Sequence, residues 1–118
     1  MLLEDCHDLA AEEMIKAEGG VPVFLGYKPD GASSPYPATL CVSINDEVVH
    51  GIPHDEAVLK AGDIVSLDLG LSYNGYFVDA ARTVAAGEVD SGAQMLLIAT
   101  KEALDASIKA AKVGGHLL

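Results

Sequence analysis

Two aspartates, Asp68 and Asp79, lie in a stretch whose pattern predicts one β-hairpin from Asp63 to Val84. Asn74-Gly75 in its middle favours a two-residue type I′ turn, because both central positions of that turn require a positive φ. Side chains alternate between the two faces of a strand, so a turn at this point directs both carboxylates to the same face. The two residues would then be diagonal cross-strand neighbours, roughly 7–8 Å apart at the backbone.

Two carboxylates at this distance repel each other unless positive charge lies between them. A pair of divalent cations would remove the conflict, since two-metal hydrolytic sites hold their ions about 3.5–4 Å apart between such ligands. Gly70, opposite Asp79 in the predicted register, would leave room for an ion. The alternative is a solvated hairpin face with two aspartates that bind nothing, and the spacing alone does not separate the two interpretations.

A histidine stands at a predicted bend of the chain. His50 ends a short predicted strand, Glu47 to His50, and is followed by Gly51 and Pro53. Glycine permits unusual dihedral angles and proline disfavours regular strand pairing, so these residues predict a tight corner. A histidine at such a corner can present one ring nitrogen to a ligand, although an ordinary loop histidine is the simpler interpretation.

The remaining elements would give the hairpin a core. Apolar residues at three- and four-residue intervals predict helices from Leu3 to Glu18 and from Ser91 to Lys112, and alternation predicts a strand from Ala38 to Ile44. Ser91 followed by Gln94 matches a capping box. The apolar face of the hairpin comprises Val65, Leu67, Leu69, Leu71, Val78, Ala80 and Val84. We expect an α+β fold in which both helices pack on this one face of an antiparallel sheet.

The composition narrows the class of protein. A length of 118 residues suits a single domain covering residues 1–118. The formal net charge of −11 argues against nucleic acid and anionic membranes as partners, and no apolar run approaches the ~20 residues of a membrane span. Since the chain shows no signal-peptide pattern, we expect a soluble, cytoplasmic protein whose two cysteines, Cys6 and Cys41, stay reduced.

Three segments together resemble a known family. They read CVSINDEVVHGIP, AGDIVSLDLG and NGYFVDAARTV, and they follow a first helix, an FLGY segment and Tyr36-Pro37. This order is similar to the N-terminal half of a type I methionine aminopeptidase. That family has the pita-bread fold, which consists of two pseudo-symmetric αβ halves. The resemblance implies that this chain forms one half of such a fold.

The resemblance also implies roles for particular residues. Asp68 would chelate one metal ion and Asp79 would bridge two, the ions being Mn, Fe, Co or Zn. His50 would lie near the scissile peptide, help to position it and stabilise the transition state. Tyr36 and Cys41 resemble part of the pocket for the methionine side chain. The family's remaining metal ligands, a histidine and two glutamates, belong to a half that this sequence does not contain, so the ligand set would be incomplete.

The sequence supports competing hypotheses about function. The first is a metal-dependent aminopeptidase that removes the N-terminal methionine from nascent proteins or peptides, present here as a half-enzyme that is inactive or nearly so alone. The second is a non-catalytic half-domain that binds partners, and the third is a stable fragment without activity. The joint presence of His50, Asp68 and Asp79 favours the first. An exposed half-fold face would also promote self-association, as a two-fold homodimer.

Overall fold

The computed structural model describes residues 6–54 and 56–116, with the backbone alone at residues 6 and 7. At its centre is a long hairpin of β3 (Ile64–Tyr73) and β4 (Tyr76–Ala85). The turn has φ values of 50° at Asn74 and 83° at Gly75, the two positive angles that a type I′ turn requires. The strands pair antiparallel from Tyr73 opposite Tyr76 down to Ile64 opposite Ala85, which confirms the predicted register.

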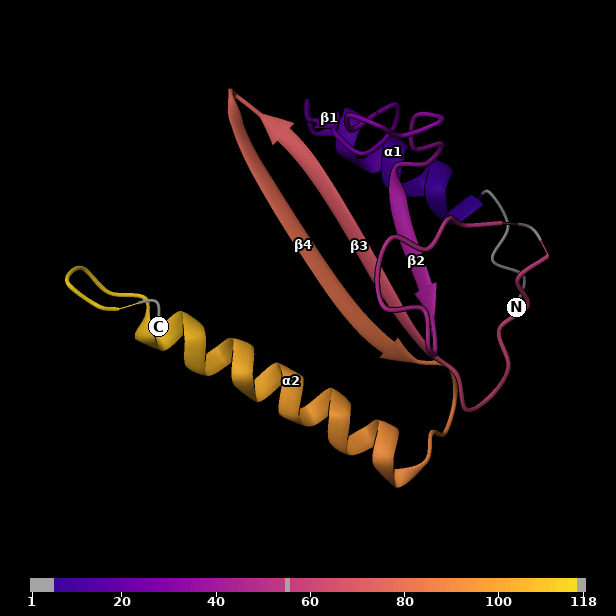
Figure 1. Ribbon diagram of the computed structural model, residues 1–118, viewed down its shortest axis with the longest axis vertical. Helices are drawn as coiled ribbons and strands as arrows, with labels where there is room; N and C mark the ends of the chain where they lie inside the picture. Colours follow the sequence, from indigo (N-terminus) through magenta and orange to yellow (C-terminus); the bar gives the residue numbers. More distant parts are fainter. Residues whose placement is uncertain (1–5, 55, 117–118) are drawn as a thin grey trace.

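The other two strands lie along the edge of β3 that faces away from β4 (Figure 1). β2 (Leu40–Ile44) pairs antiparallel with the first half of β3, and β1 (Val21–Pro22) pairs antiparallel near its end. With two helices and an antiparallel sheet, the fold is α+β, as predicted. Within the described residues, the outer edge of β4 has no strand partner.

The core of the molecule is small and centres on β2. The buried side chains are those of Ile15, Ala38, Leu40, Cys41, Val42 and Val65, together with the polar Thr39 and Ser43. The half-buried Ile44, Ala57, Leu59, Leu67 and Leu69 pack against part of this core. β4, by contrast, is exposed along almost its whole length. The predicted apolar face is therefore buried beside β2 but open on the outer strand, where Val78 is 56% exposed.

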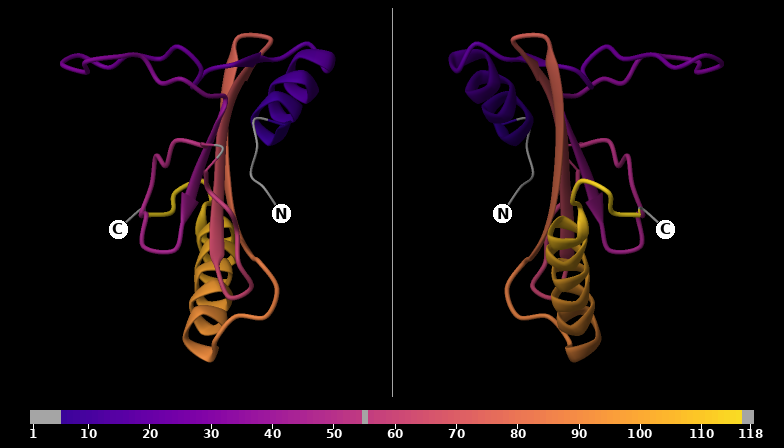
Figure 2. Two further views of the ribbon diagram at one scale, coloured as in Figure 1. Left: turned by 90° about the vertical axis from the view of Figure 1, so that its right-hand side faces the viewer. Right: turned by 90° about the vertical axis from the view of Figure 1, so that its left-hand side faces the viewer.

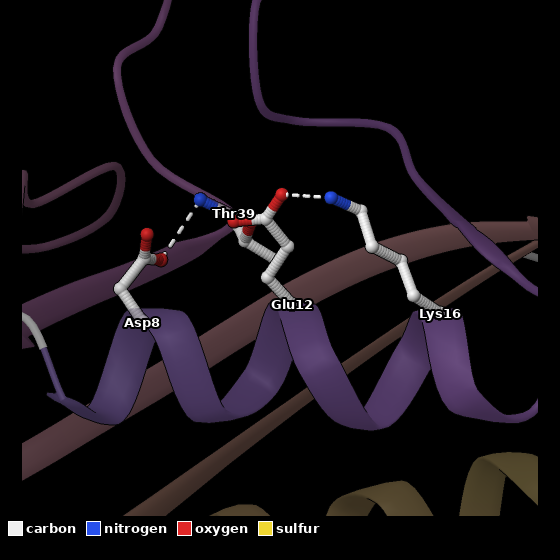
Figure 3. Close-up of polar contacts among 4 residues, drawn as sticks. All are labelled: Asp8, Glu12, Lys16 and Thr39. Carbon is white, nitrogen blue, oxygen red and sulfur yellow. Dashed lines mark hydrogen bonds and ion pairs between the residues drawn. The ribbon is translucent and has the colours of Figure 1, made fainter.

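Helix α1 (Cys6–Ala17) lies on one side of the sheet, and the loop of residues 23–38 extends from the other side (Figure 2). The start of the predicted helix, residues 3–5, lies outside the described residues. The carboxylate of Asp8 accepts a hydrogen bond from the backbone N–H of Thr39 at 2.8 Å (Figure 3). The same oxygen accepts a second one from the N–H of Leu40 at 2.7 Å. One carboxylate thus ties α1 to the start of β2.

Helix α2 (Ser91–Ala110) does not pack where the sequence predicts. It runs beyond β4, in line with the sheet rather than on a face of it (Figures 1 and 2). None of its residues is buried, and at least half of the side chain area is exposed at Met95, Leu96, Ile98, Leu104 and Ile108. An apolar stripe indicates that one face of a helix packs against another surface, but it does not indicate which surface that is. The prediction that both helices cover Val65, Leu67 and Leu69 is therefore wrong for α2.

Two local predictions are also wrong. Residues 47–50 do not form a strand, because His50 has a φ of 61°, a left-handed conformation that an extended chain does not adopt. The N-cap of α2 is Asp90 rather than Ser91, and its carboxylate accepts a hydrogen bond from the N–H of Ala93 at 2.9 Å. No helix in the described part of the chain is both long and apolar enough to cross a membrane.

Candidate metal centre

Asp68 of β3 and Asp79 of β4 point to the same face of the sheet. Gly70 lies directly opposite Asp79, and Asp68 lies opposite Ala81. Residues two positions apart on a strand share a face, so the register brings the two carboxylates together as the sequence predicts. Asp68 is half-buried because β2 flanks it, whereas Asp79 on the outer strand is exposed.

One oxygen of Asp68 is buried without a hydrogen-bond partner. Among the described residues, no donor reaches its Oδ1. Burial raises the pKa of Asp68, the negative charge of Asp79 raises it further, and the charge of His50 lowers it. A carboxylate oxygen without water or a donor is unfavourable. A bound cation would remove that cost, since it favours the charged form.

His50 lies at the left-handed corner that follows β2. Its side chain is exposed, and its charge acts on Asp68, so the imidazole and the carboxylate lie within electrostatic reach of each other. The next residue, Gly51, accepts a hydrogen bond from the N–H of Val42 at 2.9 Å, which holds the corner against the outer edge of β2. The chain therefore returns along the edge of β2 that faces away from β3.

Tyr36 and Cys41 belong to the same group of residues. Cys41 lies directly opposite Asp68 across the β2–β3 pairing, and its thiol is free and buried. Burial raises the pKa of Cys41, the neighbouring hydroxyl of Tyr36 lowers it, and the charge of Asp68 raises it. The pKa of Tyr36 is raised well above its usual value, first by burial and then by the neighbouring Cys41. The polar groups of both residues therefore lie beside Asp68 in a region that is largely closed to solvent.

The space above Gly70 is filled by protein, which corrects one expectation. A Cβ on Gly70 would lie 2.7 Å from Cε1 of Phe24 and 2.8 Å from Cγ2 of Val23. The missing side chain therefore admits two apolar residues rather than an ion. Phe24 consequently stands beside Asp79 on the carboxylate face, as an apolar wall that sequence reasoning missed. The only signal for it was a glycine opposite an aspartate, which is compatible with either occupant.

The residues present fit a divalent cation in chemistry but not in number. Carboxylate oxygens suit hard divalent ions, and the Oδ1 of Asp68 meets no hydrogen-bond donor among the described residues. In the described part of the chain, however, no three histidine, cysteine, aspartate or glutamate residues are grouped closely enough to hold a metal ion together. Asp68 and Asp79 would therefore supply part of a coordination shell.

Curated relatives of this chain are methionine aminopeptidases. It is 51% identical over 107 residues to the methionine aminopeptidase of Aquifex aeolicus, an overlap of 91% of this chain and 42% of the relative. It is 44% identical over 110 residues to methionine aminopeptidase 1 of Mycobacterium tuberculosis, covering 93% of this chain and 39% of the relative. The chain thus spans about two fifths of the length of these proteins.

Solved structures give the same result for the fold. The crystal structure of methionine aminopeptidase from Thermotoga maritima superposes with a TM-score of 0.83 at 40% identity, covering 94% of this chain and 42% of that one. The enzyme from Rickettsia prowazekii gives a TM-score of 0.76 at 32% identity. The predicted resemblance to one half of a pita-bread fold is confirmed. The profile of metallopeptidase family M24 matches residues 3–117, and this chain belongs to that family.

Proposed function

We propose that this chain is the N-terminal half of a methionine aminopeptidase, folded as one domain over residues 1–118, and that it carries two of the enzyme's metal-binding carboxylates. The observation that supports this most strongly is the buried Oδ1 of Asp68, which meets no donor in the described part of the chain, in a residue that shares a sheet face with Asp79. The relatives that share its sequence bear the same activity in their names.

In this proposal Asp68 and Asp79 would supply part of the coordination of two divalent ions, of Mn, Fe, Co or Zn. Such ions supply an activated water for attack on a peptide carbonyl. His50, exposed at its corner and within electrostatic reach of Asp68, orients the amide of the bound peptide. Tyr36 and Cys41 line the pocket for the methionine side chain at the N-terminus of a nascent protein or peptide in the cytoplasm.

Self-association is part of the proposal. On β4 and α2, large apolar side chains are exposed, and no strand among the described residues pairs with the outer edge of β4. Exposed surfaces of this kind bind partners. We propose that a second copy covers this surface about a two-fold axis. The net charge of −11 per chain opposes the association, so salt should strengthen it by screening the repulsion. Sedimentation as a monomer at every salt concentration would exclude the dimer.

Asp68 and Asp79 alone would supply only part of the coordination of two ions, so turnover of a Met-Gly-type peptide by the isolated chain with added Mn or Co should be negligible. A chimera tests the function directly: this chain replaces the matching segment of the Thermotoga maritima enzyme. The chimera should cleave N-terminal methionine, Asp79→Ala in the chimera should abolish cleavage, and Asp30→Ala, in an exposed loop, should not. A folded chimera that is inactive, or one that tolerates Asp79→Ala, would contradict the proposal.

A further inference from the structure

Gly51, the residue after His50, is held by three hydrogen bonds, two to β2 and one to the loop that precedes β2. Its N–H donates to Oγ of Ser43 at 3.0 Å, and its carbonyl oxygen accepts from the N–H of Val42 at 2.9 Å and from the hydroxyl of Tyr36 at 2.8 Å. A Cβ at position 51 would lie 2.1 Å from the carbonyl oxygen of Val42, so only glycine can approach the strand this closely. The peptide groups on both sides of Gly51 are therefore held in place.

His50 itself needs such support. Its φ of 61° lies in the left-handed region, which is unfavourable for a residue with a side chain and persists only where surrounding contacts impose it. The side chain of His50 is exposed, so its own packing does not supply these contacts. The hydrogen bonds to the adjacent Gly51 are the contacts that can.

We propose that the hydroxyl groups of Tyr36 and Ser43 are positioning groups for His50, which set its imidazole on the Asp68 side of the sheet. The inference rests on the proposed role of His50 at the peptide amide. A phenol has one proton, and its 2.8 Å contact with the oxygen of Gly51 is shorter than its 3.3 Å contact with that of Leu40. Tyr36 therefore acts on the corner through its hydroxyl, besides any contact of its ring with substrate.

The geometry of the two hydroxyls suits this role. Ser43 is 3% exposed and Tyr36 is half-buried, so water competes little for their hydrogen bonds to Gly51. The two bonds fall on opposite ends of the same residue, one on its N–H and one on its carbonyl. Together they restrict rotation of the peptides that flank it, which a single bond would not do.

Four variants of the full chain test the inference. Tyr36→Phe and Ser43→Ala each remove one hydroxyl and keep most of the buried volume. Tyr27→Phe and Ser34→Ala are the matched controls, because both residues are exposed and neither side chain makes a hydrogen bond within the described structure. Ser43→Thr, which retains a hydroxyl, serves as the rescue variant.

The readouts are the imidazole resonances of His50 and the amide exchange rates along the sheet, measured by NMR. In Tyr36→Phe and Ser43→Ala the His50 resonances should shift, and the Val42 amide should exchange about tenfold faster, as expected for the loss of one net hydrogen bond. Amides shared by β3 and β4 should keep their rates. Both controls and Ser43→Thr should resemble the unmodified chain.

Two results would overturn the inference. One is an unchanged His50 spectrum in both hydroxyl variants. The other is an equal acceleration of every amide in the sheet, which would mean general destabilisation rather than positioning. Adding Mn²⁺ to the same samples tests the proposed function separately: if it fails to broaden the Gly70 amide, opposite Asp79, the metal site is rejected while the result on His50 stands.

Discussion

Replacement of Asp8 by alanine tests how the molecule is held together. The Asp8 carboxylate accepts hydrogen bonds from the N–H groups of Thr39 and Leu40 at 2.8 and 2.7 Å, and these two residues are 0% and 6% exposed. Asp8→Ala leaves both donors buried without an acceptor, at about 1–3 kcal/mol each. We therefore expect the free energy of unfolding to fall by about 2–6 kcal/mol, a large part of the stability of a small domain.

Urea unfolding followed by far-ultraviolet circular dichroism is the suitable assay, because the chain has no tryptophan. Glu13→Ala, on the exposed side of the same helix, is the control and should change stability little. Asp8→Asn keeps an acceptor oxygen and should lose roughly half as much. Asp8 also lies in the first helical turn, where a negative charge alone contributes about 0.3–1 kcal/mol. If Asp8→Ala lowers the free energy of unfolding by no more than this charge effect, the hydrogen bonds from Thr39 and Leu40 to Asp8 do not stabilise the fold as proposed.

Three further predictions concern single residues. Gly70→Ala should destabilise the fold by about 1–3 kcal/mol in urea unfolding, since its Cβ would lie 2.7 Å from Cε1 of Phe24; unchanged stability would show that the ring moves freely. The Cys41 thiol, with its pKa raised chiefly by burial, should be alkylated far more slowly in the folded chain than in urea, as peptide mass spectrometry can measure. Hydrogen bonds from Asn45 and a backbone N–H lower the pKa of Asp63, so its stabilisation is present above an unfolded pKa of about 3.9 and is lost as pH falls through the lower folded value. In Asp63→Asn the melting temperature should therefore fall less steeply as the pH is lowered below about 4. An equally steep fall in both proteins would refute this.

The hairpin could be predicted from sequence because its determinants are local. A two-residue Asn-Gly turn fixes the register, and the register fixes which face carries Asp68 and Asp79. The helix α1 and strand β2 were likewise visible in local periodicity. Each of these features is determined by residues within a single helix, strand or turn.

The rest depends on contacts between distant parts of the chain. The hydrogen bonds from Thr39 and Leu40 to the Asp8 carboxylate join residues more than 30 positions apart. Neither the charge of Asp8 nor its position in the helix indicates these partners. Val48 and Val49 suggest a strand by propensity, but tertiary hydrogen bonds at the following corner impose a left-handed residue. The apolar stripe of α2 is likewise not covered by any other part of the described structure, so none of its residues is buried.

Binding of Mn²⁺ to the purified chain tests the central claim most directly, with bound and free ion distinguished by electron paramagnetic resonance at physiological ionic strength. We expect weak binding that Asp68→Asn and Asp79→Asn each reduce by about tenfold or more, a change of about 1.4 kcal/mol. Asp30→Asn, which removes the same charge from an exposed loop, should leave it intact. Equal binding by the unmodified chain and all three variants would mean that Mn²⁺ is attracted only by the net charge of −11. That result would contradict a site formed by Asp68 and Asp79.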